Sequence, residues 1–146
     1  MKSNNGFTIV EMVIAIGIAV ILTTVIFISV NPIKQFARSR DNRRLIDVNA
    51  ILTAVSQNMT ESRGYLSCSG GATTTVPTTS VQIGRATGNF NLESCLAPVY
   101  ISAVPMDPKI GTPSSTGYYI LRNATSSAVT IIASSTEATG TISVTR

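Results

Sequence analysis

An unbroken apolar stretch near the N-terminus constrains this chain more than any other feature. Residues 7 to 30 hold 18 hydrophobic residues in 24 positions. As an α-helix the stretch extends about 36 Å, which exceeds the roughly 30 Å hydrocarbon core of a bilayer. It is apolar on every side, which is not the pattern of a surface helix. The sequence therefore predicts one membrane-spanning helix ahead of a single small domain.

A cleaved secretory signal and a simple signal anchor are two alternatives for this stretch. A secretory signal has an apolar core of roughly 7 to 15 residues and a small-x-small cleavage site after it. The stretch is longer, and the Phe-Ile-Ser-Val-Asn-Pro at residues 27–32 is a poor site. A simple anchor leaves Glu11 unexplained, because a carboxylate within an apolar helix is costly. Glu11 lies either at the membrane interface or inside the span with a function.

The composition excludes most catalytic sites. Charged residues make up 12% of the chain, against roughly 25% in an ordinary soluble domain. The chain has no His and only two Cys, so it lacks the residues for a Ser-His-Asp site, a Cys-His site or a four-ligand Cys/His zinc site. No glycine-rich phosphate loop is present. We expect a protein that is not an enzyme and uses no cofactor or metal, although a site of carboxylates, lysines and hydroxyls is the remaining catalytic alternative.

The residues around the start of the apolar stretch form a specific motif. A polar leader, Met-Lys-Ser-Asn-Asn-Gly, precedes the sequence Phe-Thr-Ile-Val-Glu at residues 7–11. This arrangement resembles the N-terminus of type IV prepilins and pseudopilins. In that family a membrane peptidase cleaves after the Gly and methylates the new N-terminal residue. The resemblance implies cleavage after Gly6, N-methylation of Phe7, and Glu11 as the fifth residue of the mature chain.

Elementary electrostatics supports a role for Glu11. After cleavage Phe7 carries a free amine, and staggered helices in a filament can bring it to Glu11 of the next subunit. Two buried charges that are each costly alone become tolerable as a pair, and a misregistered subunit leaves one of them bare. We therefore expect Thr8 and Glu11 to set assembly and register.

The resemblance implies a structural function. The chain is predicted to be a subunit of a type IV pilus-like surface filament that serves adhesion, motility or DNA uptake. Its precursor would cross the cytoplasmic membrane once, with the N-terminus inside. Expected partners are further copies of the chain in a helical polymer, the prepilin peptidase, the membrane platform of the assembly machinery, and the lipid bilayer before assembly. The alternatives are a pseudopilin of a type II secretion or competence system, and a minor pilin that binds DNA or surfaces.

The fold implied is α+β, with a long N-terminal helix packed on a small antiparallel β-sheet, the pilin fold. We divide the chain into a leader (1–6), a transmembrane and assembly helix (7–30), an amphipathic stalk (31–62) and a globular domain (63–146). Asn31-Pro32 interrupts the apolar stretch, and Pro32 is expected to kink or locally melt the helix rather than end it, with Gly64 as the stop.

Helical periodicity after Pro32 predicts which side of the stalk is buried. The apolar positions within an arc of about 80° are Leu45, Val48, Leu52, Val55 and Met59, with Ile51 on the flank. The residues expected on the outward side are Arg40, Arg43, Asp47, Asn58 and Glu61.

The net charge of +4 is concentrated in the stalk, in a segment we call the basic collar. Its bases are Lys34, Arg38, Arg40, Arg43 and Arg44, and its one acid is Asp41. We expect the collar to face lipid headgroups or acids of neighbouring subunits, with DNA phosphates as the alternative. Positive charge normally stays in the cytoplasm, which conflicts with the orientation that the leader motif requires; we follow the motif.

Cys68 and Cys95 are expected to form a disulfide, because the chain is predicted to leave the cytoplasm. The bridge would close a loop of 28 residues and stabilise the domain by about 3–4 kcal/mol. Two free thiols are the alternative. Asn58 and Asn123 lie in short glycosylation sequons.

The C-terminal third predicts an antiparallel meander. A rigid turn with Pro105 and Pro108 around Met-Asp is followed by strands at 118–121, 128–133 and 141–144. This order is similar to the C-terminal sheet of the major pseudopilin of type II secretion, which binds calcium through acids of its last loop. Here that loop offers only Glu137, so no calcium site is expected.

Overall fold

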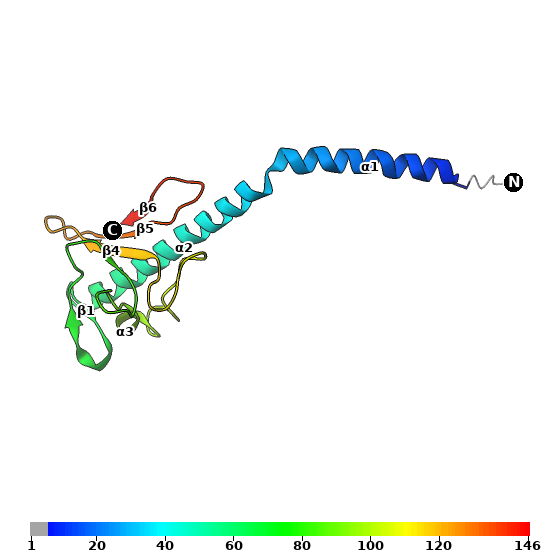
Figure 1. The fold of residues 1–146 in the computed structure, drawn as a ribbon. Coiled ribbons are helices and arrows are strands. Elements are labelled where there is room, and N and C mark those ends of the chain that lie inside the picture. The colour runs from blue at the N-terminus through cyan, green and yellow to red at the C-terminus, as the bar shows by residue number, and fades with distance from the viewer. Residues whose placement is uncertain (1–5) are drawn as a thin grey trace. The chain divides into compact units, whose positions relative to one another are not determined.

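The computed structural model describes residues 6–146, which divide into one unit that ends at Phe36 and another from Ala37 to Arg146. Each unit is described by itself. The first contains helix α1 (Ile9–Val30) and the start of helix α2 (Pro32–Glu61) (Figure 1). Helix α1 begins where it does because the Thr8 hydroxyl accepts a hydrogen bond from the Glu11 amide at 3.3 Å, a side-chain N-cap.

Asn31 separates α1 from α2. Its backbone is left-handed (φ 45°, ψ 76°), and its carbonyl accepts the Lys34 amide at 3.1 Å. Steric clash with Pro32 disfavours the helical conformation at residue 31, whereas Pro32 itself is well suited to the first position of a helix. The interruption expected at Asn31-Pro32 is therefore a one-residue break at Asn31, after which the helix resumes as α2.

A four-stranded antiparallel sheet forms the second unit together with α2. Its strands, in spatial order, are β3 (Val81–Gln82), β4 (Tyr118–Arg122), β5 (Val129–Ala133) and β6 (Ile142–Thr145). Smaller elements complete the unit: strands β1 (Leu66–Ser67) and β2 (Thr73–Thr74), a 3₁₀ turn at Ser69–Gly71, and helix α3 (Glu93–Leu96). The strands β4 to β6 lie along α2 in Figure 1. This is the α+β class predicted from the sequence.

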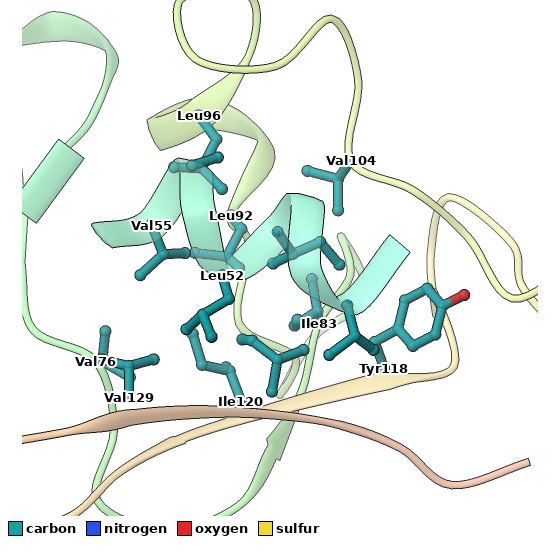
Figure 2. Packing of buried hydrophobic residues seen from close by; sticks show 14 of the residues in the cluster. Leu52, Val55, Val76, Ile83, Leu92, Leu96, Val104, Tyr118, Ile120 and Val129 are labelled. Atoms are coloured by element: carbon teal, nitrogen blue, oxygen red, sulfur yellow. The ribbon is translucent and has the colours of Figure 1, made fainter. Parts of the chain in front are cut away.

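The hydrophobic core lies between α2 and the sheet. Side chains in β4 and β5 alternate between buried and half-buried, so one face of each strand points at the helix. Figure 2 shows Leu52 and Val55 of α2 against Ile120 and Val129 of the sheet. Ile51, Val55 and Ile120 are fully buried. These contacts hold the part of α2 around Leu52 and Val55 on the sheet.

The buried side of α2 differs from the predicted side. Leu45 is 45% exposed, whereas Ile51, expected on the flank, is fully buried. Asp47 and Asn58, expected to face outward, are also buried. The prediction failed for Asp47 and Asn58 because the domain supplies hydrogen-bond partners that helical periodicity alone does not reveal.

The end of α2 follows the prediction closely. The helix ends at Glu61, and the Gly64 amide donates to the Met59 carbonyl at 2.7 Å. Gly64 has a φ of +89°, a left-handed backbone that favours glycine after a helix.

Candidate functional site

The peptide bond between Gly6 and Phe7 lies just ahead of the N-cap of α1. Phe7 is 76% exposed, and a Cβ built on Gly6 meets no atom of the described residues within 4 Å. The described part of the fold therefore does not itself require glycine at position 6. A requirement for glycine there would come from a protein that binds this segment.

Helix α1 has an apolar surface, and its side chains are exposed from Ile9 to Ser29. Residues Ile9–Ser29 form a helix that is long and apolar enough to span a membrane, and none of these residues is buried. The hydroxyls of Thr23 and Thr24 donate to the Ala19 and Val20 carbonyls at 2.7 and 2.9 Å. Glu11, in the first turn, is the one ionisable side chain of α1 and is exposed. The helix thus offers one charge on a surface that is otherwise apolar or internally bonded.

Arg44 is the centre of a buried ion-pair cluster in the second unit. Its fully buried guanidinium donates to both carboxylate oxygens of Asp107, at 2.7 and 3.1 Å. It also donates to Asp41 at 2.8 Å and to Glu137 at 3.2 Å. One arginine of α2 therefore binds the two loops that contain Asp107 and Glu137.

Asp41 fastens the loop between β5 and β6 to α2. Its carboxylate accepts the amides of Ala138 and Thr139 at 2.8 and 2.9 Å, and the Thr139 hydroxyl at 2.9 Å. The Glu137 amide also donates to it. Because the same loop sends the Glu137 side chain back to Arg40 and Arg44, the loop is held through both backbone and side chain.

The three acids of the cluster are strongly stabilised in the ionised form. Hydrogen bonds from Arg40, with further ones from Lys109 and Arg44, hold the pKa of Glu137 at about 2. Burial alone would raise the pKa of Asp41, but the Ala138 and Thr139 amides and Arg44 outweigh it and lower that pKa well below its ordinary value. Burial also opposes ionisation of Asp107, and Arg44 together with the following amides lowers its pKa. The cluster therefore stays charged at neutral pH.

A second buried contact lies next to this cluster. The Tyr118 hydroxyl donates to Asp47 at 3.0 Å, and Arg43 pairs with the same carboxylate at 3.1 Å. Burial raises the pKa of Asp47 in spite of both partners. Asp47 thus connects the start of β4 to α2, although the sequence pattern placed it outside.

The Asp107 turn is packed too closely for larger residues at two glycines. A Cβ at Gly111 would clash with the Asp107 backbone, and one at Gly117 would lie 2.8 Å from the Asp107 Cβ. Gly117 also has a φ of +84°. The rigid turn predicted from the two prolines therefore contains Asp107, whose carboxylate binds Arg44.

Most of the basic collar is not a free positive surface. Three of its bases, Arg40, Arg43 and Arg44, form ion pairs with acids of the second unit. Within residues 6–146, the other two, Lys34 and Arg38, are exposed and take part in no ion pair. The collar was predicted from neighbours in sequence, whereas two of the acids that pair with it, Asp107 and Glu137, lie 63 to 97 residues further along the chain.

Sequence reasoning missed Asp107, Glu137 and Lys109 as members of this cluster. The one available indication was the i,i+3 spacing of Asp41 and Arg44, which allows a pair on one helix face. Across the described part of the chain, no group of three or more His, Cys, Asp or Glu side chains could hold a metal ion. The cluster acids face guanidinium and ammonium groups instead.

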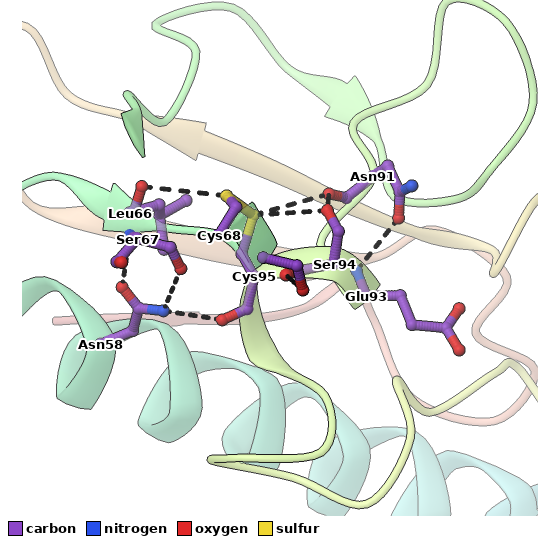
Figure 3. Close-up of a disulfide and its surroundings, with 9 residues drawn as sticks. Asn58, Leu66, Ser67, Cys68, Asn91, Glu93, Ser94 and Cys95 are labelled. Carbon is purple, nitrogen blue, oxygen red and sulfur yellow. Dashed lines mark hydrogen bonds between the residues drawn. A yellow bond between two sulfur atoms is a disulfide. The ribbon is translucent and has the colours of Figure 1, made fainter. Parts of the chain in front are cut away.

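Cys68 and Cys95 are joined in a disulfide. Beside it, the fully buried Asn58 donates to the Ser67 and Cys95 carbonyls at 2.8 and 2.7 Å and accepts the Ser67 amide at 2.8 Å (Figure 3). Asn58 therefore ties both ends of the bridged loop to α2. Its amide is not accessible for glycosylation in the folded domain.

Comparison with known proteins finds a match for the N-terminal segment alone. Residues 1–27 match the family model of the prokaryotic N-terminal methylation motif. No curated protein and no solved structure matches the chain. The motif supports the type IV pilin and pseudopilin family. It ends within α1, so the similarity of the C-terminal part to the major pseudopilin stays a prediction.

Proposed function

We propose that this chain, which carries the prokaryotic N-terminal methylation motif, is a structural subunit of a type IV pilus-like surface filament. It is made as a precursor that α1 anchors in the cytoplasmic membrane, with the N-terminus inside. The prepilin peptidase cleaves after Gly6 and methylates Phe7. Mature subunits then leave the membrane through an assembly platform and polymerise through α1.

The uncovered surface of α1 is the observation that carries this proposal. Large exposed apolar surfaces on proteins mark contacts with membranes or with other proteins. Every described side chain from Phe7 to Ser29 is exposed, and the span is 21 residues long. Lipid can cover this surface in the precursor, and the α1 helices of neighbouring copies can cover it in a filament. The same residues therefore serve first as anchor and then as filament core.

Glu11 gives the polymer its register in this proposal. It is the one ionisable side chain of α1, so each subunit contributes a single carboxylate to an apolar bundle. Cleavage creates the Phe7 amine, which supplies the matching positive charge from a neighbouring subunit. A subunit out of register leaves a buried charge without its partner, which costs about 3–5 kcal/mol. Thr8, which caps the helix, fixes the backbone of this first turn.

The second unit forms the outer coat of the filament in this proposal. Its loops are tied to α2 by the cluster around Arg44, and its first segment after α2 by the disulfide and Asn58. These contacts give a domain that keeps its shape on a surface exposed to the medium.

Two substitutions test the proposal in the cells that make the protein. Gly6→Leu should leave a precursor of unprocessed mass, because the peptidase no longer accepts the cleavage site. Glu11→Ala should leave a membrane-inserted, processed chain but no filaments in the electron microscope. Thr23→Ala is the matched control within α1, since its hydroxyl bonds only to its own helix backbone. Normal filaments from Glu11→Ala, or loss of filaments from both α1 variants alike, would refute the pairing.

A further inference from the structure

The first two turns of α2, residues 32–38, form a short exposed segment directly after the membrane span. The span ends at Ser29, and α2 begins at Pro32. Ile33 is 78% exposed and Phe36 is 65% exposed. Lys34 and Arg38 are exposed as well. Two large apolar side chains and two bases thus lie on the surface within seven residues.

Helical geometry separates these residues into two sides. At about 100° per residue, Ile33 and Phe36 point in directions roughly 60° apart. Lys34 and Arg38, one turn apart, are centred about 150° away from that apolar pair. An aromatic or aliphatic side and a basic side on one short helix are typical of a segment that lies at a membrane surface.

The ion pairs of the second unit decide which bases are available to a partner. Arg40, Arg43 and Arg44 are bound to acids of their own domain. Together with Lys109 they face four acids, Asp41, Asp47, Asp107 and Glu137, so this group is neutral. Within residues 31–44 this leaves Lys34 and Arg38 without an ion pair among the residues that the structure describes. They are also the two bases of the collar nearest in sequence to the span.

We propose that residues 32–38 bind anionic phospholipid headgroups while the precursor is in the membrane. This rests on the proposed function only in that α1 must span the bilayer. Phe36 and Ile33 would enter the interfacial region, because a helix that lies at a membrane surface buries its apolar side at the boundary of headgroups and acyl chains. Lys34 and Arg38 would face the phosphates, because bases close to a span are attracted to anionic lipids. Arg38 follows Pro32 by six residues, a rise of about 9 Å along α2, so both bases stay close to the end of the span.

The experiment uses the full chain with Phe36→Trp, which introduces the sole Trp of the protein. The chain is reconstituted into phosphatidylcholine vesicles that contain a small fraction of either dansyl-phosphatidylglycerol or dansyl-phosphatidylcholine. Energy transfer from the Trp reports how strongly each lipid gathers around the segment. We expect more transfer to the anionic probe than to the neutral one. The preference should decline at high salt, because ions screen exposed charges.

Two double variants in this background separate a local site from net charge. Lys34→Gln with Arg38→Gln should bring the two transfer signals to parity. Arg63→Gln with Arg146→Gln removes the same charge from exposed bases elsewhere and should leave the preference intact. Parity before any base is removed, or an equal loss in both double variants, would overturn the proposal.

Two further measurements distinguish failures of different kinds. Release of the chain by alkaline carbonate would show that α1 does not span the bilayer, which contradicts the proposed function and this inference together. Retention with parity of transfer contradicts the lipid preference alone. A labelled DNA duplex added to neutral vesicles tests the other polyanion. Binding that requires Lys34 and Arg38, with parity between the lipids, would assign these bases to nucleic acid and overturn the lipid site.

Discussion

Replacing Arg44 tests the buried ion-pair cluster most severely. Arg44→Met keeps the length of the side chain but removes the guanidinium that pairs with Asp41, Asp107 and Glu137. Removing one partner of a buried pair typically costs about 3–5 kcal/mol, because the remaining charges stay buried. Unfolding entropy is about 2.1 cal/mol/K per residue, so for roughly 110 residues this loss lowers Tm by about 13–22 °C. The unit should remain folded at low temperature, because ordinary domains have about 5–15 kcal/mol of stability.

Circular dichroism of the full chain in a mild non-ionic detergent measures this loss, with the disulfide kept oxidised. Arg43→Gln is the matched control, since Arg43 is exposed and its pair with Asp47 should contribute no more than about 1 kcal/mol. Hydrogen exchange adds a local readout: the Ala138 and Thr139 amides, which donate to Asp41, should exchange faster in Arg44→Met. A melting temperature equal to that of Arg43→Gln, with unchanged exchange, would refute the view that Arg44 organises the cluster.

Three further predictions concern the second unit. Because the pKa of Glu137 lies at about 2 against an ordinary 4.5, its ionised form stabilises the fold above pH 4.5, and this stability is lost as the pH falls toward 2. In acid titrations followed by circular dichroism, Glu137→Gln should flatten this loss of stability, and an unchanged loss contradicts the role of Glu137. Replacing Cys68 and Cys95 by Ser should lower the free energy of unfolding by about 3–4 kcal/mol in urea titrations. If this free energy falls by less than it does when an exposed residue is replaced by Ser, the disulfide is not needed for stability. Asn58→Ala leaves buried backbone groups without partners and should cost about 1–3 kcal/mol in the same titration, whereas no shift in midpoint contradicts its role.

The features that depend on neighbours in sequence could be predicted well. The apolar stretch predicted a membrane-spanning helix, because length and hydropathy are local properties of the sequence. The structure has a helix of sufficient length and apolarity at Ile9–Ser29. The three C-terminal strands fall close to their predicted ranges, since alternation and turn residues are also local. The interruption at Asn31-Pro32 was expected as a kink or local melting, and the structure has a one-residue break there. The proline was visible, but the left-handed backbone of its neighbour was not.

The features that depend on distant partners could not be predicted. Five closely spaced bases were interpreted as a positive surface, although Arg44 is fully buried and its partner Asp107 is 63 residues away. Asp47 and Asn58 were placed outside because a polar residue on an amphipathic helix normally faces solvent. Burial became favourable once Tyr118 and the backbone of residues 67 and 95 supplied hydrogen bonds. Hydropathy patterns contain no information on such partners.

The most direct test of the proposed function is the N-terminus of the chain in surface material. Cells that make the protein are sheared, the released material is viewed by electron microscopy, and its N-terminal peptide is weighed by mass spectrometry. The proposal predicts long, thin filaments whose subunits begin at Phe7 with one added methyl group. Subunits that retain residues 1–6, or a surface fraction that contains the chain without filaments, would contradict it.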